Sequence, residues 1–222
     1  MNETTKSKKV WGDLEHSILV GNGIDIGCGP DPVTPTTRRF DMEDGDANEI
    51  SKYVTEQFDF VYSSHCLEHM HHPQQALLEW WKLVKPGGHL FFTVPDEDLY
   101  EQGVFPSRFN LDHKATFTIA KSQSWSAVSY NVIDLVSALP NSLLISVKLQ
   151  DHNYNRSRLK FGPPPELPPW LRISWRIYNK FKSKKMILWP AFERKVASYF
   201  PVDQTLIADT LAQIQCIVKK IN

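Results

Sequence analysis

The stretch Gly23-Ile-Asp-Ile-Gly-Cys-Gly29 decides the fold. Ile24 and Ile26 favour a short buried strand, and the two glycines after them indicate a tight turn where the backbone can approach a ligand closely. In an open α/β sheet, ligands bind beyond the carboxyl ends of the strands. Many tight turns use such glycines, so this stretch alone predicts a strand and a turn, and motifs elsewhere in the chain are needed to indicate a function.

Strands and helices alternate along the rest of the chain. Extended or strand segments are predicted at 38–41, 58–64, 89–94, 143–147 and 213–218. Apolar spacing predicts helices from Pro73 to Val84 and from Trp125 to Leu139, with a short helical stretch around 205–212. This alternation is typical of an α/β domain with a mostly parallel sheet.

Length and composition exclude several classes of protein. The chain has 222 residues, 41% of them hydrophobic, which is enough for one compact domain with a core. Its three cysteines, an odd number without close spacing, argue against a disulfide framework and favour a cytoplasmic setting. No apolar run approaches the roughly 20 residues of a membrane span, and no apolar region of a signal peptide comes after residues 1–10.

Charge is balanced overall but unevenly distributed. Lys and Arg number 25, as do Asp and Glu, so we expect no nucleic-acid partner. Residues 1–110 carry 9 basic against 18 acidic side chains, whereas residues 156–195 carry 11 basic against 2 acidic ones. One basic segment therefore balances an acidic amino-terminal half.

The basic segment comes after a Pro-rich stretch at 162–169 and has a helical pattern. Trp170, Ile173, Ile177 and Phe181 share one helical face, and Arg172, Arg176 and Lys180 share another. Residues 171–177 also alternate with period two, but the Pro168-Pro169 start and the length favour a helix. The segment 170–195 has several candidate roles: an active-site lid, a dimer contact, a peripheral contact with an anionic membrane or phosphate-bearing substrate, or a cap packed on the sheet.

Three motifs occur in a fixed order: Ile24-Asp-Ile-Gly-Cys-Gly29, Phe58-Asp-Phe-Val-Tyr-Ser-Ser-His-Cys-Leu-Glu-His69 and Leu83-Val-Lys-Pro-Gly-Gly88. In this the chain resembles the class I S-adenosylmethionine-dependent methyltransferases, most closely the small-molecule "LEH"-type branch, methyltransferase domain type 11. The resemblance covers roughly residues 20–150 and the strand at 213–218. It implies a Rossmann-like α/β fold, a seven-stranded mostly parallel sheet with an antiparallel last strand, flanked by helices.

We expect a single methyltransferase domain over residues 1–222. It would comprise an N-terminal leader (1–20), a cofactor-binding core (21–150), a Pro-rich and basic helical insertion or cap (151–204), and a last helical turn and strand (205–222). Only 28 residues separate Gly29 from Phe58, where the family usually fits two helices and two strands. We therefore expect loop to replace much of that region.

The resemblance implies S-adenosylmethionine as the cofactor and assigns eight residues to it: Asp25, Gly27, Cys28, Gly29, Asp41, Asp46, Ser64 and His65. The glycine turn would pass under the methionine part, and Asp25 would fix the turn or the amino group. Asp41 would take the ribose hydroxyls, because a carboxylate accepts two hydrogen bonds, unless it is a solvated turn acid. Asp46 would lie beside the adenine, and Ser64 and His65 near the sulfonium.

His113 is the candidate catalytic base. It lies in a loop-like stretch after the fifth strand, where the family places substrate-facing residues, and a histidine titrates near neutrality. The alternative is a histidine that only anchors this loop. Tyr100, Arg108 and Asp112 are candidate substrate contacts.

The segment His65-Cys-Leu-Glu-His69 also matches a zinc-protease pattern, in which a helix presents two histidines to a metal. The segment comes directly after a buried strand and occupies the family's own LEH position, which explains the pattern without a metal. In the similar ubiquinone-pathway O-methyltransferases, Glu68 and His69 match a reported metal-binding pair. We favour a packing and hydrogen-bonding role here and predict no metal.

The expected function is methyl transfer from S-adenosylmethionine to a small-molecule or glycan-like acceptor, with O-methylation preferred. The alternative is a catalytically inactive S-adenosylmethionine-binding regulatory or scaffold protein, suggested by the short region after Gly29. A nicotinamide-dependent oxidoreductase is disfavoured, because Pro32 stands where the third glycine of the dinucleotide motif belongs. The sequence does not identify the acceptor or the oligomeric state.

Overall fold

The computed structural model describes residues 3–119, 121–163, 166–182 and 190–221. Its main sheet has the strand order β2-β1-β3-β4-β8-β7. The strands are β1 (Gly23–Ile26), β2 (Arg38–Phe40), β3 (Phe58–Ser64), β4 (Val84–Pro95), β7 (Ser142–Gln150) and β8 (Gln213–Lys220). Strands β2, β1, β3 and β4 pair in parallel, whereas β8 is antiparallel to both of its neighbours. A separate small sheet pairs β5 (Thr116–Thr118) with β6 (Ser129–Asn131).

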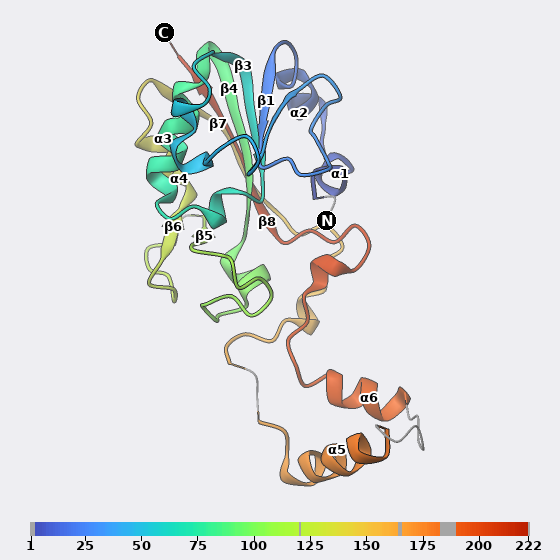
Figure 1. Cartoon of the computed structure of the whole chain (residues 1–222). Helices are drawn as coiled ribbons and strands as arrows, with labels where there is room; N and C mark the ends of the chain where they lie inside the picture. The colour runs from blue at the N-terminus through green and yellow to red at the C-terminus, as the bar shows by residue number, and fades with distance from the viewer. Residues whose placement is uncertain (1–2, 120, 164–165, 183–189, 222) are drawn as a thin grey trace.

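Helices cover both faces of the main sheet (Figure 1). On one face lie α3 (Pro73–Lys82) and α4 (Val132–Ser137), and on the other α1 (Glu3–Lys8) and α2 (Asp13–Ile18). Beyond the end of the sheet lie α5 (Pro169–Lys182) and α6 (Pro190–Ala197). Short helical turns are η1 (Ala47–Lys52), η2 (Leu67–His69), η3 (Glu97–Glu101), η4 (Arg156–Arg158) and η5 (Gln204–Leu206). Among the described residues, no helix combines the length and apolar character needed to cross a membrane.

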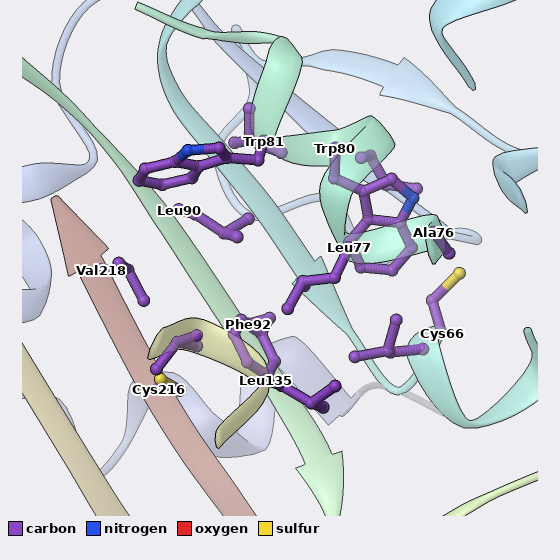
Figure 2. Packing of buried hydrophobic residues seen from close by; sticks show 14 of the residues in the cluster. Cys66, Ala76, Leu77, Trp80, Trp81, Leu90, Phe92, Leu135, Cys216 and Val218 are labelled. Atoms are coloured by element: carbon purple, nitrogen blue, oxygen red, sulfur yellow. The ribbon is translucent and has the colours of Figure 1, made fainter. Parts of the chain in front are cut away.

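Alternating side chains of the central strands build one core on each face of the sheet. Leu90 and Phe92 of β4 point into the larger core under α3 and α4, and Phe91 between them points into the smaller core beside α2. Figure 2 shows the larger core, where residues of α3, β4, α4 and β8 meet. Successive residues of a strand point to opposite faces, so both faces of the central strands are apolar and covered.

Helix α3 anchors the larger core through two tryptophans. Pro73 occupies the first turn, where its missing N–H costs nothing, and Ala76, Leu77, Trp80 and Trp81 are buried along one side. The Nε1 of Trp80 donates to the carbonyl of Ala47 at 2.9 Å, and that of Trp81 donates to the carbonyl of Pro140 at 2.8 Å. Each indole therefore buries its ring and satisfies its one donor.

The predicted strands at 58–64, 89–94, 143–147 and 213–218 are confirmed, as are the helix after Pro73 and the antiparallel last strand. The basic segment begins as a helix, α5, and not as a strand. The expected seven strands are not found: the described residues form a main sheet of six. The stretch between Gly29 and Phe58 holds only β2 and η1, because its prolines and short length leave no room for another strand and helix.

Two helix predictions are wrong in extent. The helix expected from Trp125 to Leu139 is limited to α4, because side chains before it bind η3 instead. The Oγ of Ser124 donates to Glu97 at 2.8 Å, and the Nε1 of Trp125 donates to Asp98 at 3.1 Å. The stretch expected around 205–212 holds only η5, and the left-handed backbone of Ala208 (φ 39°) comes after it.

Replacing Trp80 by alanine tests the larger core. The fully buried indole leaves a cavity and an unpaired carbonyl, so we expect Trp80→Ala to lower the free energy of unfolding by about 3–5 kcal/mol. Urea unfolding followed by circular dichroism measures this. Trp170→Ala is the matched control, because Trp170 is 55% exposed and its loss is expected to change stability by about 0.5 kcal/mol or less. Equal effects of the two substitutions would contradict this account of the core.

Candidate cofactor and acceptor site

The turn after β1 requires glycine at position 27. Gly27 has φ 73°, and its N–H donates to the carbonyl of Phe40 at 2.8 Å. A Cβ atom there would lie 2.7 Å from the Cβ and Sγ of Cys66, a distance that side-chain atoms do not tolerate. Gly29 has φ 51° and no atom within 4 Å of such a Cβ, so its surroundings are open. The backbone thus turns sharply here and leaves space on one side.

Asp25 lies beneath this turn and holds the returning loop. It is fully buried, its Oδ2 accepts the N–H of Val33 at 2.6 Å, and its Oδ1 has no hydrogen-bond partner in the structure. Burial, opposed by the Val33 hydrogen bond, raises the pKa of Asp25 to about 7. Of the two roles expected for Asp25, the contacts therefore match the fixing of the turn.

Two cavities lie next to each other at the carboxyl ends of β1 and β3, and both are lined by Gly27, His65 and His69. The larger one, about 620 Å³, we call the β2 cavity; it is also lined by Phe40, Asp41, Met42, Gly45, Asp46, Ala47, Cys66, Met70 and Asp112. The other, about 430 Å³, we call the α1 cavity; it is also lined by Glu3, Thr4, Cys28, Gly29, Pro30, Asp31, Ser64, Glu68, Tyr100, Phe109, Asn110, His113, Asp203, Thr205 and Leu206.

Two predicted cofactor acids line the β2 cavity. The carboxylate of Asp41 accepts the N–H of Gly29 at 2.7 Å and that of Met42 at 2.8 Å. Asp46 caps η1, where its Oδ1 accepts the N–H and the side-chain amide of Asn48, both at 2.8 Å. These hydrogen bonds lower the pKa of Asp46. Both acids therefore sit at fixed positions on the edge of this cavity.

His65 stands at the end of β3 between the two cavities. Its backbone is left-handed (φ 52°), and its Nε2 lies 2.7 Å from the Oε1 of Gln213 on β8. Its Nδ1 lies 3.4 Å from Glu68. Burial works against the charged imidazole, but the contact with the Glu68 carboxylate outweighs it and raises the pKa of His65 to about 9. His65 is therefore a cation at neutral pH.

Glu68 carries an unusual buried charge. The residue is 1% exposed, and neither carboxylate oxygen has a hydrogen-bond partner in the structure. Burial acts to raise its pKa, but the nearby His65, His113 and His69 lower it below its usual value. A buried carboxylate is costly unless it is paired, so these histidines stabilise its ionised form.

His113 is buried on the wall of the α1 cavity and is held by a second carboxylate. Its Nδ1 lies 2.6 Å from the Oε1 of Glu101, and its Nε2 lies 4.0 Å from Glu68. The ring of Tyr100 lies over the imidazole with 5.3 Å between centroids. A charged acceptor at Nδ1 fixes the proton there and leaves Nε2 as the basic nitrogen. The sequence pointed to His113, but no local pattern marked Glu101, twelve residues earlier.

Glu68, His69 and His113 bring potential metal ligands together. One ligand atom from each lies within 4.8 Å of the others, a set that would suit a divalent cation. His69 also lies 2.9 Å from a carboxylate oxygen of Asp112. The absence of a metal from the site stays a prediction.

The three predicted substrate contacts lie in different places in the structure. Tyr100 lines the α1 cavity together with His113, whereas Asp112 lines the β2 cavity. Arg108 is not among the residues lining either cavity, because its guanidinium donates to the carbonyl of Gly162 at 2.5 Å and so ties two loops together. The structure thus shows a loop contact for Arg108, and its contact with substrate stays a prediction.

Sequence reasoning also missed the cover of the α1 cavity. The segment 1–20 was expected as a leader, but its described residues form α1 and α2, and Glu3 and Thr4 of α1 line the cavity. The Nζ of Lys6 donates to the carbonyl of Thr205 at 2.7 Å, and the Oγ1 of Thr5 donates to Asp31 at 2.6 Å. These contacts join residues far apart in the chain, so no spacing in the sequence could reveal them.

Comparison with known proteins identifies the family. The methyltransferase domain family matches residues 14–134, and the chain belongs to this family. No match was found among curated proteins. Similar solved structures include a putative sarcosine dimethylglycine methyltransferase from Galdieria sulphuraria, with a TM-score of 0.48, 10% identity and coverage of 99% of this chain and 84% of that one. A SAM-dependent methyltransferase from Archaeoglobus fulgidus has a TM-score of 0.47 and 14% identity, over 99% and 95% of the two chains. The [4+2]-cyclase SpnF has a TM-score of 0.47 and 14% identity, over 99% and 80%.

The cofactor of this protein is S-adenosylmethionine. Features of the site fit it: the turn at Gly27 and Gly29 brings bare backbone to the cavities, and Asp41 stands just after β2 as an acid suited to vicinal hydroxyls.

Removing the Glu68 carboxylate tests its effect on His65. In Glu68→Gln the strongest influence that raises the pKa of His65 is removed, while those of Glu3 and Gln213 remain, so we expect this pKa to fall from about 9 toward its ordinary value of 6.5. Because the folded protein binds the His65 proton more tightly than the unfolded chain does, this proton stabilises the wild-type protein fully below pH 6.5. The stabilisation is lost as the pH rises through about 9. NMR titration of the imidazole measures the shift, with Glu56→Gln, far along the chain and exposed, as control. An unchanged His65 pKa in Glu68→Gln would refute the pairing.

Proposed function

We propose that this protein transfers the methyl group of S-adenosylmethionine to a hydroxyl group of a small polar or glycan-like acceptor. The observation that carries this proposal is the 2.6 Å contact between His113 and Glu101 on the wall of the α1 cavity. A buried histidine fixed by a carboxylate is the arrangement that general-base catalysis uses. A hydroxyl must lose its proton during methyl transfer, so it gains more from such a base than a neutral amine does.

Cofactor binding is assigned to the turn and to the β2 cavity. The backbone at Gly27, Cys28 and Gly29 would pass under the methionine part, Asp41 would accept hydrogen bonds from the ribose, and Asp46 would lie near the adenine. When bound, the cofactor supplies an electrophilic methyl group on a positively charged sulfur. His65 lines both cavities and Ser64 lines the α1 cavity, and that sulfur would face the acceptor beside these two residues. The buried carboxylate of Glu68 offsets positive charge in this region.

The base works through three side chains. Glu101 would accept a hydrogen bond from the Nδ1–H of His113 and so fix the tautomer and orientation of the ring. Nε2 is then free to take the acceptor's hydroxyl proton. The imidazolium that results is stabilised by Glu101 on one side and by Glu68, 4.0 Å from Nε2, on the other.

The lining of the α1 cavity supports a polar acceptor. Beside His113 and Tyr100 it presents Thr4, Asn110 and Thr205, which exchange hydrogen bonds with hydroxyl groups. Its acidic lining residues are Glu3, Asp31, Glu68 and Asp203, and no Lys or Arg lines it in the described part of the chain. Like charges repel, so this lining favours a neutral polyhydroxylated acceptor over a phosphorylated one.

A second candidate function is binding of S-adenosylmethionine without turnover. It is supported by the region between Gly29 and Phe58, where β2 has three residues and is followed by a single short helix. A site with this shorter wall would bind the cofactor and regulate a partner. The two functions differ in one measurable respect, the appearance of methylated product.

Calorimetric titration with S-adenosylhomocysteine tests the cofactor residues. Asp41→Ala removes a charged hydrogen-bond acceptor for the ribose, so we expect the dissociation constant to rise about 10- to 100-fold. Gly27→Val places atoms against Cys66 and is expected to abolish binding. Asp134→Ala, an exposed acid on α4, is the control and should bind as the wild type does. If Asp41→Ala binds S-adenosylhomocysteine as tightly as the wild type does, Asp41 does not hold the ribose.

Methyl-transfer assays with a panel of hydroxyl and amine acceptors test the chemistry. We expect His113→Gln to lower kcat about 10²- to 10⁴-fold while S-adenosylhomocysteine still binds. Glu101→Gln should lower kcat less than His113→Gln does, because the imidazole remains but loses the carboxylate that fixes its orientation. His152→Gln changes an exposed histidine and serves as control.

Two results would overturn the proposal in different ways. An N-methylated product formed by a fully active His113→Ala variant would refute O-methylation with this base. Tight S-adenosylhomocysteine binding without any product across the panel would favour the non-catalytic alternative.

A further inference from the structure

Helices α5 and α6 stand apart from the two cores of the domain. Figure 1 shows both helices beyond the end of the sheet. The buried side chains Leu171, Tyr178 and Val196 lie on these helices and belong to neither core. We call these two helices the α5–α6 pair.

One side of α5 packs against α6. The ring of Tyr178 meets that of Phe192 at 5.4 Å between centroids, and its hydroxyl donates to Glu193 at 2.7 Å. The ring of Trp175 also lies 6.1 Å from that of Phe192. The pair therefore has a small apolar contact of its own on this side.

A second apolar side of α5 remains exposed. Four large apolar residues with helical spacing form this row: Trp170 (55% exposed), Ile173 (58%), Ile177 (53%) and Phe181 (38%). Three of these residues, Trp170, Ile177 and Phe181, also line an open groove of about 670 Å³ between the two helices. Large apolar side chains gathered in this way on a surface mark a place of contact with another apolar phase.

A basic row runs directly beside the apolar row. Arg172, Arg176 and Lys180 are exposed and succeed one another at four-residue spacing, so they lie along one line of the helix. Helix α5 contains no Asp or Glu. Arg172 reaches Glu166, which lies before the helix, at 2.8 Å. An exposed apolar row with basic residues along its flank is the pattern of a helix that lies in a membrane interface.

We propose that the α5–α6 pair binds to the surface of a membrane that contains anionic lipids, with α5 lying in the plane of the interface. The row from Trp170 to Phe181 would enter the boundary between headgroups and acyl chains. The basic row would meet the anionic headgroups, and Trp170 would sit at headgroup depth, where tryptophan is favoured.

Charge favours a membrane over a second copy of the chain as the occupant of this face. In a symmetric dimer through the apolar row, the basic row of one copy would lie near that of the other, with no acidic residue of α5 to offset the repulsion. Anionic headgroups carry the charge opposite to that of the basic row. A membrane with anionic lipids would therefore contact both the exposed apolar row and the basic row.

The distribution of charge also orients the domain on such a membrane. Residues 1–110 carry 18 acidic against 9 basic side chains, so an anionic surface repels them while it attracts the segment 156–195. Asp203, Thr205 and Leu206, a few residues after α6, line the α1 cavity. Membrane binding through the pair would therefore hold the cavity near the lipid surface, where an acceptor displayed on a membrane could reach it.

Sedimentation with lipid vesicles tests the proposal without any methyl acceptor, so the result does not depend on the proposed reaction. We expect the full chain to bind vesicles of phosphatidylcholine mixed with phosphatidylglycerol, and to bind vesicles of phosphatidylcholine alone far more weakly. Added salt should release it, because salt screens the basic row.

Two sets of variants separate the apolar and the basic rows. Ile173→Asp with Ile177→Asp should abolish vesicle binding, because it places charges in the apolar row. The triple change Arg172→Gln, Arg176→Gln and Lys180→Gln should weaken it about 100-fold, at about 1 kcal/mol for each basic residue. Arg38→Gln with Lys52→Gln and Lys82→Gln removes three exposed basic residues from the core domain and is the matched control. Circular dichroism and S-adenosylhomocysteine binding check that each variant folds.

Three results would overturn the proposal. The first is failure of the wild-type chain to bind anionic vesicles. The second is equal loss of binding in the control triple variant and in the triple variant of α5. The third is a wild-type dimer without vesicle affinity that Ile173→Asp with Ile177→Asp converts to a monomer, which would make a second copy the occupant of the face.

Discussion

The close approach of Gly27 to Cys66 is the constraint on which the site depends. It brings the turn after β1 against the segment just after β3, with no space for a side chain between them. The same packing ties the site to the larger core, because Cys66 belongs to the cluster that α3 covers (Figure 2). The two cavities meet at this point, and both are lined by Gly27 and His65. The position of the two cavities is therefore set by core packing.

The second constraint on the site is the pairing of its buried charges. Glu68 is buried without a hydrogen bond, and its ionised form depends on the histidines around it. That dependence is mutual, since the pKa of His65 is raised by the same carboxylate. A buried group of this kind costs stability that an apolar residue would not, so its presence between the cavities is more easily explained by chemistry than by folding.

The sequence predicted those parts of the molecule that depend on local patterns. Strand β3 was expected at 58–64 and is found there. His113 lies on the α1 cavity, and its role as the base stays a prediction. Contacts between distant segments were not predictable, as the partner of His113, Glu101, shows. Helical spacing after Trp125 was misleading, because Ser124 and Trp125 bind the acids of η3. Tertiary hydrogen bonds there override a local preference.

The missing seventh strand changes how Asp41 is held. Strand β2 has three residues and forms the edge of the described sheet, so no neighbouring strand supports its outer side. Edge strands this short, with exposed charges such as Arg38 and Arg39, avoid unwanted pairing but are weakly fixed. Here the glycine turn supplies the support: Gly27 donates to the carbonyl of Phe40, and Gly29 donates to Asp41. The turn that leaves space for the cofactor thus also places the acid assigned to its ribose, so the shortened region can keep that acid beside the cavity without another strand.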